Sequence, residues 1–181
     1  VNHLNEFISI DIEQAFSDAE GVMHLAERMV KRVYEDIIKG CHRELEMLGI
    51  SPKVPPTPFK RITYDEAIGR IRDLGVDIRS GEDIAEEAVE KLGMMFDSYY
   101  FITRWPSKLR PFYTARDAVD KDVSESFDLM HGDLELGSGS KRVGTKEELI
   151  QRLQEQGLNP QSFDYHLKVY DYGMPPHAGW A

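Results

Sequence analysis

The 181-residue chain is predicted to fold as an α/β (α+β) domain in which an antiparallel sheet is flanked by helices. Residues 3–13 alternate between apolar and polar side chains, and residues 127–142 have the pattern of a hairpin, so both predict strands. The two-residue turn expected at 132–133 joins antiparallel neighbours. Apolar residues at helical spacing, the longest run over 19–38, predict the helices. This length is typical of one domain.

The first strand is predicted over residues 3–13. Ile8, Ile10 and Ile12 share one face, which we interpret as core. The opposite face carries Phe7, Ser9, Asp11 and Glu13. An aromatic ring and two acids are costly to bury without partners, so a ligand-facing strand explains this face better than a solvated edge.

Helices are predicted in the middle and at the end of the chain. Ser17-Asp18-Ala19-Glu20 has the form of a capping box before the 19–38 helix, and Thr63-Tyr64-Asp65-Glu66 caps a second helix that stops near Gly75. A proline-rich connector separates the two. Further helices are predicted over 82–92, 146–156 and 160–170, with a strand over 98–105.

The predicted hairpin is the most informative part of the sequence. A two-residue turn pairs Met130 with Glu135 and Leu129 with Leu136. Alternation then places Asp128 and Glu135 on one face as diagonal neighbours. Like charges this close repel unless a cation lies between them. The pair therefore predicts a divalent ion with oxygen ligands, most simply Mg²⁺.

Two further residues, which follow this acidic pair in the sequence, extend the candidate site. Ser138 offers a hydroxyl ligand, and the glycines on either side of it let the backbone approach a bound molecule closely. Arg142 offers a planar fork for a carboxylate or a phosphate. The alternative interpretation is a surface hairpin whose charges are solvated.

Several stretches, in order along the chain, share the pattern of one family. They are His3-Leu4-Asn5-Glu6-Phe7 through Asp11 and Glu13, Arg110-Pro111-Phe112-Tyr113, Phe127-Asp128 with Glu135, Ser138 and Arg142, Gly157-Leu158-Asn159-Pro160, and Tyr172-Gly173-Met174-Pro175-Pro176-His177-Ala178-Gly179. Together they resemble the catalytic domain of class II aminoacyl-tRNA synthetases, within that class the archaeal and eukaryotic-type aspartyl-tRNA synthetases.

The resemblance implies a role for each matching residue. ATP would contact Phe7, which stacks on adenine, with His3, Leu4 and Glu135. Aspartate would contact Asp11, Ser138 and Arg142, the last through its side-chain carboxylate. Mg²⁺ would be held by Asp128, Glu135 and Ser138, and the tRNA acceptor end would touch Glu6. The implied cofactors are ATP and Mg²⁺, and the implied partners are L-aspartate, tRNA for aspartate or also asparagine, and a second subunit in a homodimer.

The implied activity is that of an aspartate–tRNA ligase, which works by orientation and charge neutralisation without covalent chemistry by the protein. Asp11 favours the aspartyl enzyme, because asparaginyl and lysyl enzymes resemble it but typically have glutamate there. An asparaginyl-tRNA synthetase, a synthetase-derived asparagine synthetase and a non-catalytic paralogue remain alternatives.

The chain also departs from the family pattern. Asn2 stands where the family usually has an arginine, which puts one ATP phosphate contact in doubt. Residues 1–181 are expected to be a partial catalytic domain without motif 1, the motif 2 arginine, motif 3 and the anticodon-binding domain. We therefore expect this chain to be inactive by itself.

The composition and the absence of certain motifs argue against several classes of protein. A formal net charge of −10 argues against a general polyanion binder. The lone Cys41 cannot form an internal disulfide, which suits a reducing cytoplasm, and no apolar run is long enough for a membrane span. The six histidines lack metal-ligand spacing, and no serine-hydrolase elbow, P-loop or dinucleotide fingerprint occurs.

Overall fold

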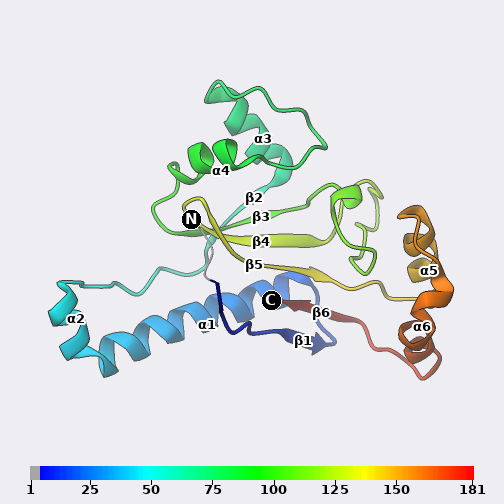
Figure 1. Ribbon diagram of the computed structural model, residues 1–181, viewed down its shortest axis with the longest axis horizontal. Coiled ribbons are helices and arrows are strands. Elements are labelled where there is room, and N and C mark those ends of the chain that lie inside the picture. Colours follow the sequence, from blue (N-terminus) through cyan, green and yellow to red (C-terminus); the bar gives the residue numbers. More distant parts are fainter. Residues whose placement is uncertain (1–4) are drawn as a thin grey trace.

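A computed structural model describes residues 5–181 as a six-stranded sheet with helices around it (Figure 1). The strands are β1 (Ile12–Ala15), β2 (Lys60–Thr63), β3 (Tyr99–Thr103), β4 (Ser126–His131), β5 (Leu134–Lys141) and β6 (His177–Trp180). Their order across the sheet is β1-β6-β5-β4-β3-β2. Neighbouring strands are antiparallel except β2 and β3, which are parallel. The predicted fold class is confirmed, with one parallel pair at an edge.

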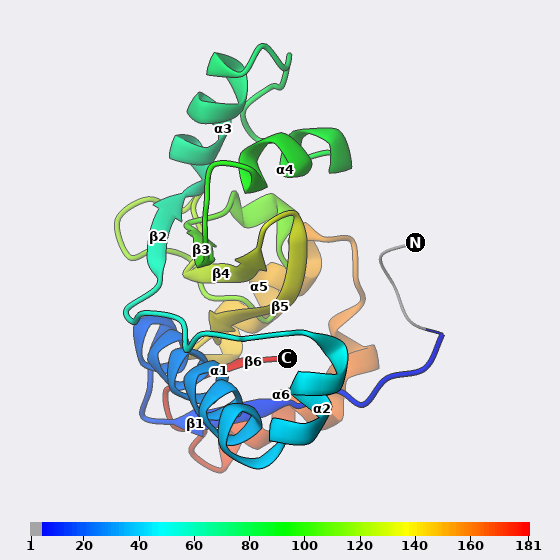
Figure 2. The same cartoon turned by 90° about the vertical axis from the view of Figure 1, so that its left-hand side faces the viewer.

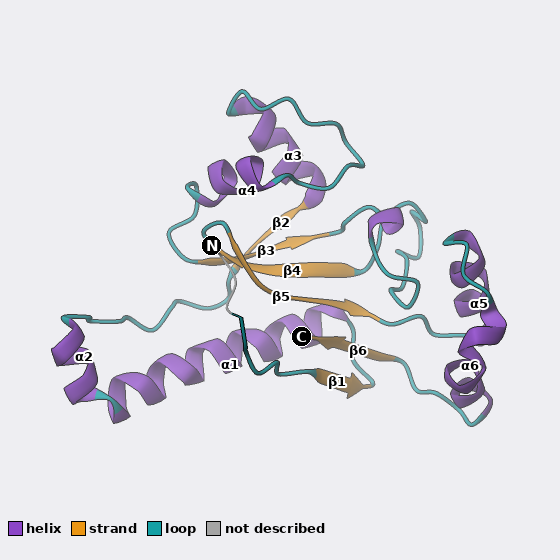
Figure 3. Cartoon of the chain, in the orientation of Figure 1, coloured by secondary structure: helices purple, strands orange, loops and turns teal. Residues whose placement is uncertain are grey.

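The helices lie around this sheet (Figure 3). They are α1 (Ala19–Gly40), α2 (His42–Leu48), α3 (Tyr64–Asp73), α4 (Glu86–Gly93), α5 (Lys146–Glu155) and α6 (Asp164–Asp171), with short 3-10 turns η1 (Ser107–Leu109) and η2 (Pro160–Phe163). The capping box of Thr63 and Glu66 is confirmed, because each side chain accepts a bond from the other's backbone N–H. At α1 the cap is Asp18, which accepts from Gly21 N at 2.8 Å, and not Ser17.

The two faces of the sheet have different neighbours. Along β4, Phe127 and Leu129 point to one face, where they form a core cluster with α1. Met130 points to the other face and joins a second cluster with α3 and α4. A third cluster lies between α5 and α6, at the end of the sheet (Figure 1). The face opposite α1 is therefore where polar residues of β4 and β5 remain open to a ligand.

The N-terminal prediction was wrong over most of its length. Residues 7–11 have no regular structure, and the strand begins only at Ile12. Ile8 is 94% exposed and Ile10 58% exposed, so neither belongs to the core, while Ile12 is half-buried against the α1 cluster. Figure 2 shows this segment extending away from the sheet. The reason is that alternation makes a strand possible, but strand pairing with β6 extends only over Ile12–Ala15.

A buried carboxylate fixes α1 to the strand beside it. Glu27 is 3% exposed, and its Oε1 accepts from the backbone N of Phe59 at 2.8 Å and from Arg61 Nη1 at 3.0 Å. Arg61 also pairs with Glu20, which is solvent-exposed. These bonds orient the start of β2.

We expect Glu27→Ala to lower the free energy of unfolding by about 3 kcal/mol, because it leaves Arg61 and the Phe59 N–H without their buried acceptor. Glu20→Ala removes the exposed partner of the same arginine and should cost less than about 1 kcal/mol. Denaturant unfolding of the two variants measures both values. Equal losses would show that the buried position of Glu27 has no special importance.

Candidate active site

The β4–β5 hairpin forms with the predicted turn and a shifted register. Met130 pairs with Glu135, as predicted. A bulge follows, so Leu129 pairs with Gly137, and the predicted pairing of Leu129 with Leu136 was wrong. Leu136 is the extra residue of the bulge, a local irregularity that alternation alone does not reveal. Its consequence is that Asp128 lies directly opposite Ser138 across the ladder.

The turn itself is held from outside the hairpin. Gly132 has a φ of 60°, which favours glycine, and its carbonyl accepts a bond of 2.9 Å from the Tyr100 hydroxyl. Gly93 packs so closely that a Cβ there would lie 2.4 Å from the Gly132 carbonyl carbon. The end of α4 thus contacts the turn directly before β5, the strand that carries Glu135.

Asp128 and Glu135 line one small cavity of about 210 Å³ on the sheet face opposite α1. The structure therefore brings together the two acids that the hairpin pattern placed on one face. Its other lining residues are mostly apolar: Asp83, Ile84, Val89, Ile102, Trp105, Leu109, Arg110 and Met130.

Asp128 is the buried member of the pair, at 3% exposure. Its Oδ2 accepts from Arg110 Nη2 at 2.5 Å, and its Oδ1 is buried with no hydrogen-bond partner among residues 5–181. Burial raises the pKa of Asp128 to about 7, the Arg110 guanidinium opposes that rise, and the carboxylates of Glu135 and Asp83 add to it.

The residues around the buried Oδ1 of Asp128 show whether this site fits the predicted cation. No group of three His, Cys, Asp or Glu side chains in the described part of the chain could hold a metal alone. Asp128 and Glu135, with the Ser138 hydroxyl opposite Asp128, are nevertheless the type of donor set that suits Mg²⁺, which takes one or two carboxylates and completes its shell with water and substrate phosphates. An unpartnered carboxylate oxygen fits that requirement.

A second cavity of about 180 Å³ adjoins the first through Arg110, which lines both. Besides Arg110, its lining includes the guanidinium of Arg142 and five hydroxyl side chains, those of Tyr113, Thr114, Ser126, Ser138 and Ser140. Two guanidinium groups beside several hydroxyls are suited to an anionic ligand.

Arg142 is already partly engaged in this cavity. Its Nε and Nη2 donate to the carboxylate of Glu13, and its Nη1 donates to Ser140 Oγ at 2.7 Å. The guanidinium also lies over the Tyr113 ring, 5.1 Å from its centroid. A guanidinium has five N–H groups, so these three bonds leave two N–H groups for a ligand carboxylate.

The remaining predicted site residues lie elsewhere or outside the description. Neither cavity is lined by Glu6, Phe7 or Asp11, which are exposed in the N-terminal segment. Phe7 is 75% exposed and is therefore not a core residue. His3 and Leu4 lie outside the described residues.

Arg110 is the site residue that pattern analysis did not single out. It belongs to the Arg-Pro-Phe-Tyr run that the family resemblance includes, but no local periodicity assigned it a role. Its guanidinium stacks over Trp105 at 4.3 Å and pairs with Asp128. A basic residue shortly after a buried strand was the available signal.

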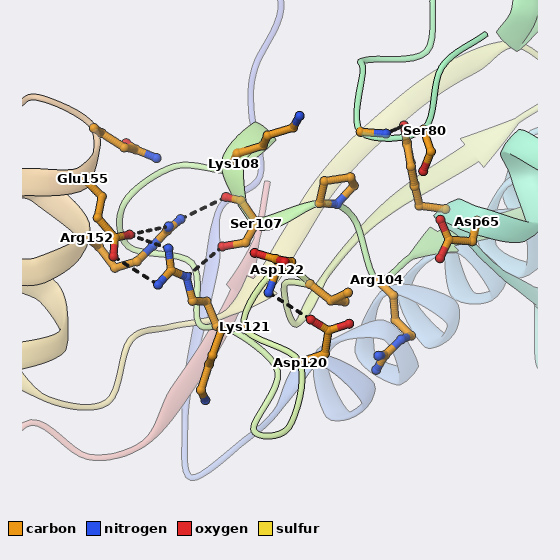
Figure 4. A pocket seen from close by; sticks show the side chains of 16 residues that line it. Asp65, Ser80, Arg104, Ser107, Lys108, Asp120, Lys121, Asp122, Arg152 and Glu155 are labelled. Atoms are coloured by element: carbon orange, nitrogen blue, oxygen red, sulfur yellow. Dashed lines mark hydrogen bonds and ion pairs between the residues drawn. The ribbon is translucent and has the colours of Figure 1, made fainter.

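A cavity of about 610 Å³ lies on the other side of the η1 turn and contains none of the predicted site residues (Figure 4). Its lining mixes acids and bases, and Glu155 pairs with both Arg116 and Arg152 there. We therefore assign the candidate active site to the two smaller cavities that the hairpin lines.

The whole chain, residues 1–181, matches the family model described as tRNA synthetases class II (D, K and N). An aspartate–tRNA(Asp/Asn) ligase of Methanothermobacter thermautotrophicus is 48% identical over 180 residues, which are 99% of this chain and 41% of that protein. An aspartate–tRNA(Asp) ligase of Thermoplasma acidophilum is 42% identical over 178 residues, 98% of this chain and 42% of that protein.

Solved structures show the same fold. The asparaginyl-tRNA synthetase of Pyrococcus horikoshii in complex with asparaginyl-adenylate matches with a TM-score of 0.90 at 28% identity, over 99% of this chain and 42% of that one. The aspartyl-tRNA synthetase of Entamoeba histolytica matches with a TM-score of 0.87 at 28% identity, over 94% of this chain and 37% of that one.

The fold is that of a class II aminoacyl-tRNA synthetase catalytic domain. The chain belongs to the family of class II synthetases that comprises the D, K and N enzymes. It spans about two fifths of the length of the curated relatives it matches. Among residues 5–181, no helix has the length and apolar character that crossing a bilayer requires.

The raised pKa of Asp128 predicts a pH dependence of stability. Between about pH 4 and pH 7 the native protein holds this proton more than the unfolded chain does, so the stabilising contribution is present at pH 4 and is lost as pH rises. Asp128→Asn does not titrate. The melting temperature of the wild type minus that of Asp128→Asn should therefore fall over this range. A difference that grows with pH would mean that pairing with Arg110 outweighs burial.

Proposed function

We propose that the intact protein is an aspartate–tRNA ligase. The α-carboxylate of aspartate attacks the α-phosphate of ATP, which gives aspartyl-adenylate and releases pyrophosphate. The terminal ribose hydroxyl of tRNA then attacks the adenylate and releases AMP. The acceptor is tRNA for aspartate, with tRNA for asparagine as a second acceptor because the relative that is 48% identical is named for both.

The main support is that relatives named as aspartate–tRNA ligases are 40–48% identical over nearly the whole chain. The site agrees with this activity in its charges. Arg142 keeps two N–H groups for the side-chain carboxylate of aspartate, with the Ser138 hydroxyl in the same cavity. Recognition of a carboxylate by a planar guanidinium favours aspartate over a neutral side chain.

The phosphates of ATP are proposed to lie at the acidic cavity. Bound Mg²⁺ neutralises phosphate charge and orients the phosphate oxygens. Asp128, Glu135 and Ser138 would hold it, and Arg110 would keep Asp128 in place. The chain's own contribution is then orientation and charge stabilisation, not a covalent step.

The N-terminal segment is proposed to complete the site in the intact, cytoplasmic homodimer. Phe7 exposes 75% of its surface, so its ring is available to stack on adenine. His3 and Leu4 would contact the nucleotide, Asp11 the amino acid and Glu6 the tRNA. These assignments rest on the family resemblance of the segment, since the two cavities are lined by other residues.

An asparaginyl-tRNA synthetase is the second candidate. The observation that favours it is the TM-score of 0.90 to the Pyrococcus horikoshii enzyme that holds asparaginyl-adenylate. ATP–pyrophosphate exchange by the intact protein separates the two, with aspartate or asparagine as the amino acid. Exchange that depends on aspartate supports the ligase proposed here, and exchange with asparagine alone overturns it.

Glu135 provides the test of the metal role. We expect Glu135→Gln in the intact protein to abolish ATP–pyrophosphate exchange, because one ligand charge at the phosphates is lost. Glu135 is exposed, so the melting temperature should be unchanged. Asp133→Asn, an exposed acid of the adjacent turn, is the matched control and should exchange normally. Normal exchange by Glu135→Gln would remove this residue from the site.

Arg142 provides the test of amino-acid recognition. Loss of one partner of a charge-assisted pair costs about 2–5 kcal/mol, so Arg142→Leu should raise the aspartate KM by about 30-fold or more and leave the ATP KM nearly unaltered. The control is Glu13→Gln, because Glu13 is the internal partner of Arg142. If Glu13→Gln raised the aspartate KM equally, the ion pair and not the ligand contact would explain the effect.

A further inference from the structure

The turn over residues 107–111 lies between the 610 Å³ cavity of Figure 4 and the candidate active site. Ser107 and Lys108 line the 610 Å³ cavity, whereas Leu109 and Arg110 line the cavity that contains Asp128. A displacement of this turn would therefore move the guanidinium that holds Asp128. What fixes the turn is relevant to the geometry of the site.

A buried arginine of α5 holds the backbone of the turn. Arg152 is 2% exposed, and its Nη2 donates to the carbonyl oxygens of Ser107 at 3.1 Å, Arg110 at 3.4 Å and Pro111 at 3.5 Å. Gln156, at the end of the same helix, donates from Nε2 to the carbonyl of Arg110 at 2.8 Å. Two side chains of one helix end thus converge on one carbonyl.

The arginine is itself held in place. Glu155 accepts from Arg152 Nη1 and from both terminal nitrogens of Arg116. Arg116 Nε donates to the Ser107 hydroxyl at 3.0 Å. The Nε of Arg152 has no hydrogen-bond partner among the described residues, but both terminal nitrogens are bonded, so these contacts leave the guanidinium little freedom.

On the site side of the turn, Arg110 continues the connection. Its guanidinium packs on Trp105, whose indole N–H donates to the Ile102 carbonyl at 3.2 Å. The same guanidinium bonds Asp128 Oδ2 and leaves Oδ1 without a partner in the described part of the chain. An unbroken series of contacts therefore runs from α5 to the orientation of Asp128.

We propose that Arg152 and Gln156 are positioning residues of the active site. They fix the 107–111 turn so that Arg110 holds one oxygen of Asp128 and the other oxygen is presented to a divalent cation. This inference rests on the cation site in the proposed function. Partners behind a metal ligand orient it and commonly change metal affinity when they are removed.

Gln156→Ala tests the proposal with little risk to folding, because this glutamine is exposed. The measurement is Mn²⁺ binding to the intact protein with a non-hydrolysable ATP analogue, followed by electron paramagnetic resonance. We expect roughly tenfold weaker Mn²⁺ binding, at the lower end of what loss of a partner behind a ligand costs. Gln154→Ala, an exposed glutamine about 200° around the same helix, is the control and should bind like the wild type.

Arg152→Lys keeps the charge and loses the planar fork, so it should weaken Mn²⁺ binding further. The effect of Gln156→Ala should disappear in an Arg110→Lys background, because both changes act through the same guanidinium. A melting temperature that falls while Mn²⁺ affinity stays unchanged, or effects of Gln156→Ala and Arg110→Lys that simply add, would overturn the positioning role.

The same measurements distinguish a failure of the proposed function from a failure of the positioning role. Wild-type protein that binds Mn²⁺ with the ATP analogue but shows no aspartate-dependent exchange would refute the ligase activity and leave the positioning role to be decided by the variants. Wild-type protein that binds no Mn²⁺ would overturn the cation site and the positioning role together.

Discussion

The need to partner a carboxylate buried in the middle of a sheet governs the structure around Asp128. The facing residues on the neighbouring strands, Ile102 and Ser138, carry no charge, so the cationic partner comes from Arg110 on a turn outside the sheet. That turn has little regular structure of its own, so its carbonyls are bonded from α5. The partnering of the buried Asp128 carboxylate thus connects β4, through Arg110 and its turn, to α5.

The division of the sheet into two faces explains how this polar site coexists with a stable core. On β4, Phe127 and Leu129 pack under α1, while Asp128 and Met130 lie on the opposite face. The bulge at Leu136 keeps Asp128 opposite Ser138 and places the hydroxyl-rich part of β5 beside the second cavity. One hairpin therefore contributes both to packing and to the candidate site.

The N-terminal segment shows how ion pairing links parts that the sheet alone does not. Glu13 on β1 bonds Arg142, which follows β5, although β6 lies between these strands. Gly179 on β6 permits the close approach, because a Cβ there would lie 2.3 Å from the Glu13 carboxyl carbon. Beyond β1 the segment has no strand neighbour among the described residues, and Phe7 and Ile8 remain exposed.

The sequence by itself determined the features that depend on neighbours in the chain. The Thr63–Glu66 cap, the turn at Gly132 and the face shared by Asp128 and Glu135 follow from local hydrogen bonding, glycine conformation and alternation. The family motifs added the particular fold, which the comparisons confirm, whereas the role of Arg142 stays a prediction. Tertiary structure decided the rest: the bulge at Leu136, the exposure of Ile8 and Ile10, and the contacts that join Arg152 to the 107–111 turn and Arg110 to Asp128. Strand pairing, burial and the partnering of buried charge join residues far apart in sequence, and no local pattern encodes them.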